Sequence, residues 1–154
     1  MSTNLRILRE DDPEHAELLA QGWAITDRSW GARLTLDDDA DLSALLQAVT
    51  TAEDAGYQVR RLEPSDLPAL RALDEQVAPD FPSTPASHHE ELPADLGDRL
   101  QSGESLGFLA WTEGDGPVAY TWMDRLSDRW EVDRTGVVAA HRRRGLAVAV
   151  KAAS

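Results

Sequence analysis

The chain has 154 residues, which is long enough for one domain with a hydrophobic core and too short to expect two. It has no cysteine, which excludes disulfides, thiolate metal sites and cysteine nucleophiles. The formal net charge of −13 argues against a nucleic-acid partner, because phosphate binding depends on lysine and arginine. It shows no basic leader with an apolar segment and no apolar run of roughly 18 residues, so we expect no membrane association and a cytoplasmic location.

Residues 1–56 are predicted to form an N-terminal α/β extension. A short helix is expected over residues 14–21, where Gly22 ends it. Apolar and polar residues alternate over residues 23–36, which predicts a strand. A second helix is expected over residues 42–55, because its leucines and valine fall on one face.

Residues 57–154 are predicted to form an α/β unit of the α+β kind, a mixed and mainly antiparallel sheet flanked by helices. The predicted order is strand, helix, helix, three strands with short connections, a basic glycine turn and a last helix. The predicted strands cover residues 57–62, 106–111, 118–123 and 130–138. The predicted helices cover residues 65–77, with Ser65 as cap, 88–100 and 146–153; Pro93 interrupts the second of these, so its start stays open. The three later strands are most simply an antiparallel meander.

The turn from Val137 to Ala147 carries the strongest functional signal in the sequence. A β-branched pair ends a strand, a basic turn with Gly145 follows, and then a helix begins. Such a turn directs free backbone N–H groups and the positive end of a helix dipole toward one point, which suits a pyrophosphate. Residues 134–154 carry a charge of +5, whereas residues 1–133 carry −18. A cationic turn on an acidic chain favours a small phosphorylated ligand, although a solvated basic cluster has the same composition.

The element order together with Arg142-x-x-Gly145-x-Ala147 resembles the GNAT acyltransferases, which use acetyl-CoA or a related acyl-CoA. The signature of that family at this turn is Gln or Arg, two variable residues, Gly, one variable residue, and Gly or Ala. Arg143 is a mild departure, because many members have glycine there. The resemblance covers residues 57–154 and implies the cofactor-binding part of a GNAT-like fold, so we expect a sheet that is incomplete at the C-terminus.

The resemblance also implies roles for the residues around the turn. Backbone groups of Gly136, Val137 and Val138 would pair with the pantetheine arm of acyl-CoA, as a strand pairs with an added strand. Backbone amides of residues 142–147 would surround the pyrophosphate, and the arginines would add charge to it or to the 3′-phosphate. The implied cofactor-binding residues are therefore Gly136, Val137, Val138, Arg142, Arg143, Arg144, Gly145, Leu146 and Ala147, with no metal.

The family transfers the acyl group directly from thioester to amine, which requires a base and a donor to the developing oxyanion. Glu131 is the candidate base, because it lies eleven residues before Arg142, a spacing that matches a glutamate base in some members. Asp133 is expected on the same side of the strand, where repulsion between the two carboxylates would raise one pKa. The alternative is that both carboxylates simply face solvent. The N–H of Val137 is the expected oxyanion donor.

Other groups give weaker signals. Tyr57 and Tyr120 lie in predicted strands, where a packed ring with a satisfied hydroxyl is expected rather than a general acid. Residues 88–91 combine histidines and glutamates, but adjacent side chains on a helix do not converge on a metal. Tryptophans in three predicted strands either line an acceptor pocket or pack in the core; these are Trp111, Trp122 and Trp130.

Three functions remain open on the sequence alone, and the third, an acidic protein that mimics nucleic acid, rests only on the net charge and predicts no affinity for acyl-CoA. The first is an acyl-CoA-dependent N-acyltransferase that acetylates a primary amine of a small molecule or a protein. The second is a non-catalytic acyl-CoA-binding module that dimerises or pairs with a partner chain through an exposed sheet edge. Residues 1–56 are expected to cover part of that edge.

Overall fold

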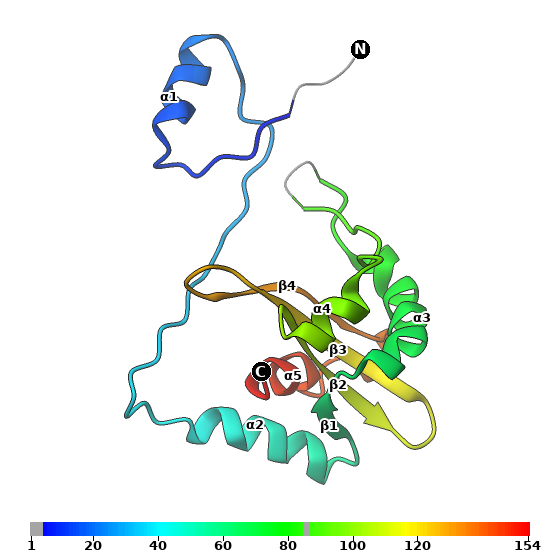
Figure 1. Ribbon diagram of the computed structural model, residues 1–154. Coiled ribbons are helices and arrows are strands. Elements are labelled where there is room, and N and C mark those ends of the chain that lie inside the picture. The colour runs from blue at the N-terminus through cyan, green and yellow to red at the C-terminus, as the bar shows by residue number, and fades with distance from the viewer. Residues whose placement is uncertain (1–4, 85–86) are drawn as a thin grey trace. The chain divides into compact units, whose positions relative to one another are not determined.

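The computed structural model describes residues 5–84 and 87–154. Its contacts divide this part of the chain into two units. One consists of residues 5–35, 81–84 and 87–90, and the other consists of residues 36–80 and 91–154. The second unit holds a four-stranded antiparallel sheet with helices packed on it (Figure 1). The predicted class, a mixed α/β fold with a mainly antiparallel sheet, is confirmed.

The first unit contains the helix α1 (Pro13–Ala20), as predicted. The Asp12 carboxylate accepts a hydrogen bond of 2.9 Å from the N–H of Glu14 and caps the first turn. The strand predicted over residues 23–36 is wrong, because the chain there forms no ladder and the side chain of Trp30 is 98% exposed. An alternating pattern becomes a strand only where a neighbouring strand supplies the hydrogen bonds.

The sheet of the second unit has the strand order β1-β2-β3-β4, and every neighbouring pair is antiparallel. The strands are β1 (Gln58–Arg61), β2 (Ser105–Thr112), β3 (Gly116–Arg125) and β4 (Trp130–Val137). The last three follow each other through short turns, which confirms the predicted meander. After β4 the chain makes a single 3₁₀ turn, η3 (Ala139–His141), and then enters α5 (Leu146–Ala152).

Helices cover both faces of this sheet (Figure 1). α2 (Ser43–Asp54) packs on α5, and the two bury an apolar cluster against one face. α3 (Leu67–Val77) and α4 (Leu96–Ser102) contact β3 and β2 on the opposite face, where Tyr120 and Trp122 are buried. α2 thus lies in the same contact unit as the sheet, and the domain boundary predicted after residue 56 stays a prediction.

Two predicted helix starts are corrected by the structure. Ser65 does not cap α3, because it lies inside the 3₁₀ turn η1 (Pro64–Asp66), where Glu63 and Asp66 form a capping box. The helix predicted over residues 88–100 is confined to α4, since the chain turns at Pro93 and the N–H of Leu96 donates to the carbonyl of Pro93 at 3.2 Å. A further 3₁₀ turn, η2 (Ala78–Asp80), follows α3.

A β-bulge interrupts β4 before it reaches the turn. Trp122 of β3 is opposite Arg134, and the next residue, Met123, is opposite Val132, so Asp133 is the extra residue of the longer strand. The bulge shifts the alternation of side chains by one position. Residues before and after Asp133 therefore do not follow a single period-two pattern.

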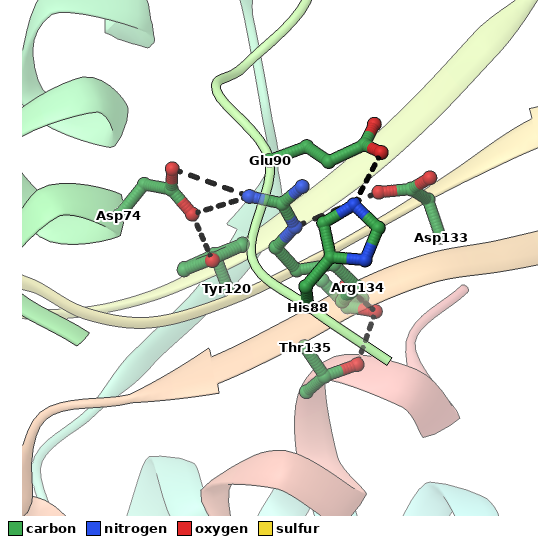
Figure 2. Close-up of polar contacts among 8 residues, drawn as sticks. Asp74, His88, Glu90, Tyr120, Asp133, Arg134 and Thr135 are labelled. Carbon is green, nitrogen blue, oxygen red and sulfur yellow. Dashed lines mark hydrogen bonds and ion pairs between the residues drawn. The ribbon is translucent and has the colours of Figure 1, made fainter. Parts of the chain in front are cut away.

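A buried ion pair fastens β4 to α3 just after the bulge (Figure 2). Nη1 of Arg134 lies 3.1 Å from Oδ1 and 3.3 Å from Oδ2 of Asp74, a residue that is only 3% exposed. The Tyr120 hydroxyl donates to the same carboxylate, which confirms the expectation of a packed ring with a satisfied hydroxyl. Burial, reinforced by this carboxylate, raises the pKa of Tyr120. The guanidinium of Arg134 also lies 4.7 Å from the ring centroid of Trp122, which packs in the core.

The variant Gly136→Ala is expected to destabilise the fold. An added Cβ would lie 2.6 Å from Cε1 of Tyr120 and 2.9 Å from Cγ2 of Val77, so strand and helix would have to separate. We expect urea denaturation to show a loss of about 1–3 kcal/mol in the free energy of unfolding. Gly114→Ala is the matched control, because its Cβ meets nothing within 4 Å. Equal stabilities of the two variants would contradict the close approach of α3 to β4.

Candidate anion-binding site

Five consecutive backbone amides after β4 have no hydrogen-bond acceptor among the described residues. They are the N–H groups of Arg143, Arg144, Gly145, Leu146 and Ala147. The chain adopts the left-handed conformation at Arg143, with φ of 62°, and again at Gly145, with φ of 79°. Runs of N–H groups in turns of this kind form concavities that bind anions. Arg142 is not one of the five, because its N–H donates to the carbonyl of Ala139 at 3.3 Å.

The side chain of Arg142 holds the turn in shape. Its Nε donates to the carbonyl oxygen of Val137 at 3.0 Å, and its Nη2 pairs with the carboxylate of Asp80. The first contact closes the turn onto the end of β4, and the second ties it to η2. The charge of Arg142 is therefore already compensated within the protein.

The side chain of Arg144 is held by a different element. Its Nη1 donates to the hydroxyl oxygen of Tyr57, which precedes β1, at 3.2 Å. That hydroxyl lies 3.0 Å from Nδ1 of His141, and Nε2 of His141 lies 3.3 Å from Oδ2 of Asp115 in the β2–β3 turn. Tyr57, His141 and Asp115 were not predicted to belong to the site. No local pattern marks them, because Tyr57 and Arg144 are 87 positions apart in the sequence.

The outer edge of β4 offers fewer backbone groups than predicted. The N–H of Val138 points inward and donates to the carbonyl of Val118 at 2.9 Å. Antiparallel pairs alternate, so Gly136 also directs its backbone groups toward β3, whereas Val137 and Thr135 direct theirs away. Any ligand that pairs along this edge would therefore meet Val137 and Thr135 rather than three consecutive residues.

The two glycines of the predicted site are required for different structural reasons. Gly136 is required for packing, as described above, while a Cβ on Gly145 would meet nothing within 4 Å. Gly145 is instead required by its positive φ, which residues with a side chain adopt only at a cost. Leu146 and Ala147 follow as the first residues of α5, with the Leu146 side chain buried against the sheet.

The predicted catalytic carboxylates, Glu131 and Asp133, line one open pocket of about 320 Å³ at the start of β4. Arg99 and Asp124 lie in the same lining and form an ion pair of 2.8 Å. Glu131 is opposite Asp124 in the ladder, and Oδ2 of Asp133 lies 3.6 Å from Nε of Arg134. Val132, between the two carboxylates, lines the same pocket, so simple alternation does not describe this part of β4, where Asp133 is the bulge residue. None of the three strand tryptophans lines it.

Residues 5–84 and 87–154 contain no group of three or more side chains arranged to hold a metal ion. Nε2 of His88 lies 2.9 Å from Oε1 of Glu90, which accounts for part of the histidine and glutamate run. Within these same ranges, every helix is too short or too polar to cross a bilayer.

No protein-family model and no curated protein sequence matches the chain. Solved acetyltransferase structures are similar to it. They include the ribosomal-protein-S18-alanine N-acetyltransferase of Escherichia coli, with 19% identity and a TM-score of 0.45 over 62% of this chain and 54% of that one. An aminoglycoside acetyltransferase from an uncultured soil metagenomic sample has 21% identity and a TM-score of 0.46 over 62% and 66%. A GCN5-related N-acetyltransferase from Kribbella flavida has 26% identity and a TM-score of 0.42 over 64% and 34%. The chain thus spans from about a third to two thirds of these proteins.

The variant Arg143→Gly is expected to stabilise the folded chain. Glycine adopts a φ of 62° without the clash that a Cβ causes, and relief of that clash is worth about 1 kcal/mol. Arg143→Ala removes the same side chain but keeps the Cβ, so it serves as the matched control. Chemical denaturation should place the glycine variant above the alanine variant. The reverse order would mean that residue 143 is not strained in solution.

Proposed function

We propose that this chain binds acyl-CoA at the turn after β4 and transfers the acyl group, most simply acetyl, to a primary amine. The observation that carries the proposal is the run of five amides, from Arg143 to Ala147, that find no acceptor within residues 5–84 and 87–154. A pyrophosphate needs several N–H donors converging from one side, with cationic side chains beside them. The turn provides both, because Arg143 and Arg144 belong to the same run.

The strand before the turn fits the rest of such a ligand. β4 advances about 3.3 Å per residue, so its backbone from Asp133 to Val138 extends over about 16 Å. An extended pantetheine arm laid along the outer edge would pair with the outward N–H of Val137, whose carbonyl already accepts from Arg142, and with the outward groups of Thr135. Its thioester end would then lie toward the bulge and the pocket that contains Glu131. The turn, the strand edge and the pocket therefore follow one another in the same order as the pyrophosphate, the pantetheine arm and the thioester of the ligand.

The chain's own groups supply the remaining chemistry. Acyl-CoA, when bound, contributes an activated thioester, and Glu131 would accept the proton that the acceptor ammonium must lose. Asp133 would add negative charge that favours a cationic acceptor in the same pocket. The N–H of Val137 lies beside the phosphate turn and would pair with the arm. The outward N–H of Thr135, nearer to Glu131, is therefore the better donor to the thioester carbonyl.

The acceptor class follows from the lining of the pocket. Asp124 is paired with Arg99 and Asp133 with Arg134, which leaves the exposed carboxylate of Glu131 as the group that an incoming amine meets. We therefore propose that the acceptor is a cationic primary amine, on a small molecule or a protein side chain.

A second candidate function is a non-catalytic acyl-CoA-binding module. Within the described residues β4 is the last strand of the sheet, and an edge strand can pair with a second copy or a partner chain. This candidate shares the phosphate turn with the first and differs only in the absence of turnover.

Calorimetric titration with coenzyme A tests the shared part of both candidates. The wild-type chain is expected to bind, and Gly145→Glu is expected to abolish binding, since it places a carboxylate among the amides at a backbone position that favours glycine. Gly31→Glu makes the same charge change where a Cβ meets nothing within 4 Å, and it should bind normally. If the wild-type chain fails to bind coenzyme A, the proposed function is wrong.

A turnover assay with acetyl-CoA and a panel of primary amines separates the two candidates. Glu131→Gln is expected to lower kcat by about 10²–10⁴-fold, the usual contribution of a general base. Its affinity for coenzyme A should not change, because Glu131 lies away from the phosphate turn. Full activity of Glu131→Gln would exclude it as the base, and binding without any turnover would favour the non-catalytic module.

A further inference from the structure

A chain of polar contacts runs from the phosphate turn into the core and back to the surface. Arg144 donates to the hydroxyl of Tyr57, that hydroxyl contacts Nδ1 of His141, and Nε2 of His141 contacts the carboxylate of Asp115. The distances are 3.2 Å, 3.0 Å and 3.3 Å in that order. Arg144 and His141 come from the segment after β4, Tyr57 precedes β1 and Asp115 lies in the β2–β3 turn, so these contacts join three separate segments of the second unit.

With the His141 ring neutral, the contacts have one consistent direction. The carboxylate of Asp115 can only accept, so Nε2 of His141 carries the hydrogen, and Nδ1 is then the acceptor. The Tyr57 hydroxyl must then donate to Nδ1, which leaves its oxygen lone pairs for the N–H of Arg144. In each of these three contacts one donor meets one acceptor, and no two groups compete for the same hydrogen.

Packing holds the side chains of this series of polar contacts in place. Tyr57 is 4% exposed and belongs to the apolar cluster between α2, α5 and the sheet. The side chain of His141 is 14% exposed and meets the Tyr57 ring edge-on, with centroids 5.8 Å apart. The hydroxyl that holds Arg144 therefore sits on a ring that cannot turn away, while the guanidinium itself remains at the surface.

The three arginines of the turn differ in what they can offer to an anion. The side chain of Arg142 already donates to the carbonyl of Val137 and pairs with Asp80. The side chain of Arg143 makes no hydrogen bond or ion pair with the described residues, so it would lose its rotamer freedom on binding a ligand. Arg144 gives one N–H to a neutral hydroxyl and keeps its charge and its other donors.

We propose that Tyr57 and His141 are positioning residues that pre-orient Arg144, and that Arg144 is the side chain that recognises the phosphates of coenzyme A. This inference rests on the proposed function. Because the guanidinium is already ordered, ligand binding does not have to immobilise it. Removal of the Tyr57 hydroxyl therefore weakens phosphate binding only through Arg144.

A double-mutant cycle measured by calorimetric titration with coenzyme A tests this. Arg144→Ala is expected to weaken binding about tenfold or more, the effect of losing a charge-assisted hydrogen bond, and Tyr57→Phe by roughly three- to tenfold. The double variant should bind no more weakly than Arg144→Ala alone. Arg143→Ala is the matched control, because it removes an equal charge from the neighbouring untethered arginine, and it should weaken binding less than Arg144→Ala.

A second variant keeps the Tyr57 ring and hydroxyl in place. His141→Leu removes the acceptor for that hydroxyl and is expected to weaken binding by a factor similar to Tyr57→Phe, again only when Arg144 is present. The proposal is wrong if Tyr57→Phe has no effect, if its effect is the same with and without Arg144, or if both arginines contribute equally. Each of these results leaves wild-type binding intact, whereas a wild-type chain that does not bind coenzyme A overturns the proposed function itself.

Discussion

The position of β4 depends on the buried ion pair between Asp74 and Arg134. A charged residue that is removed from water needs a partner, and deletion of one member of such a pair typically costs about 3–5 kcal/mol. The pair joins α3 to the strand at the residue after the bulge, so it holds β4 against α3 at that point, while pairing with β3 sets which edge of β4 faces outward. Two residues later Gly136 lets Tyr120 and Val77 close on the strand. The whole segment from Thr135 to the turn takes its place from these contacts.

Much of the fold could be predicted, because its signals are local. The three strands after residue 104 are rich in aromatic and β-branched residues and are separated by turn sequences. Each strand therefore pairs with the strand that follows it in the sequence. The segment of residues 23–36 has a similar alternation and no such neighbour, and it forms no strand. The polar stretch before α4 forms no helix, because Pro93 interrupts it, and α4 begins only at Leu96, which is buried. Periodicity predicts a face, and packing decides whether that face is used.

Of the candidate site, too, only the part with a local sequence signal could be predicted. The turn itself was predictable, because Arg142, Gly145 and Ala147 lie close together and the left-handed φ of Gly145 explains the glycine. The bulge at Asp133 was not, since nothing in the spacing of Glu131 and Asp133 shows that an extra residue lies between two ladder pairs. The role of Arg142 was also hidden. Its partner Asp80 is 62 positions away, so the sequence showed three equivalent arginines where the structure has three different ones.

These contacts change how the charge of the turn should be counted. Residues 134–154 carry +5 in the sequence, yet Arg134 is neutralised by Asp74 and Arg142 by Asp80, and His141 contacts Asp115. The attraction for an anion then comes from Arg143, Arg144 and the five amides, which lie within a few residues of each other. A diffuse basic cluster would act at long range and weaken steeply with salt. Fixed dipoles and one pre-oriented guanidinium act at contact distance, so we propose that the turn selects a compact, multiply charged group rather than negative charge in general.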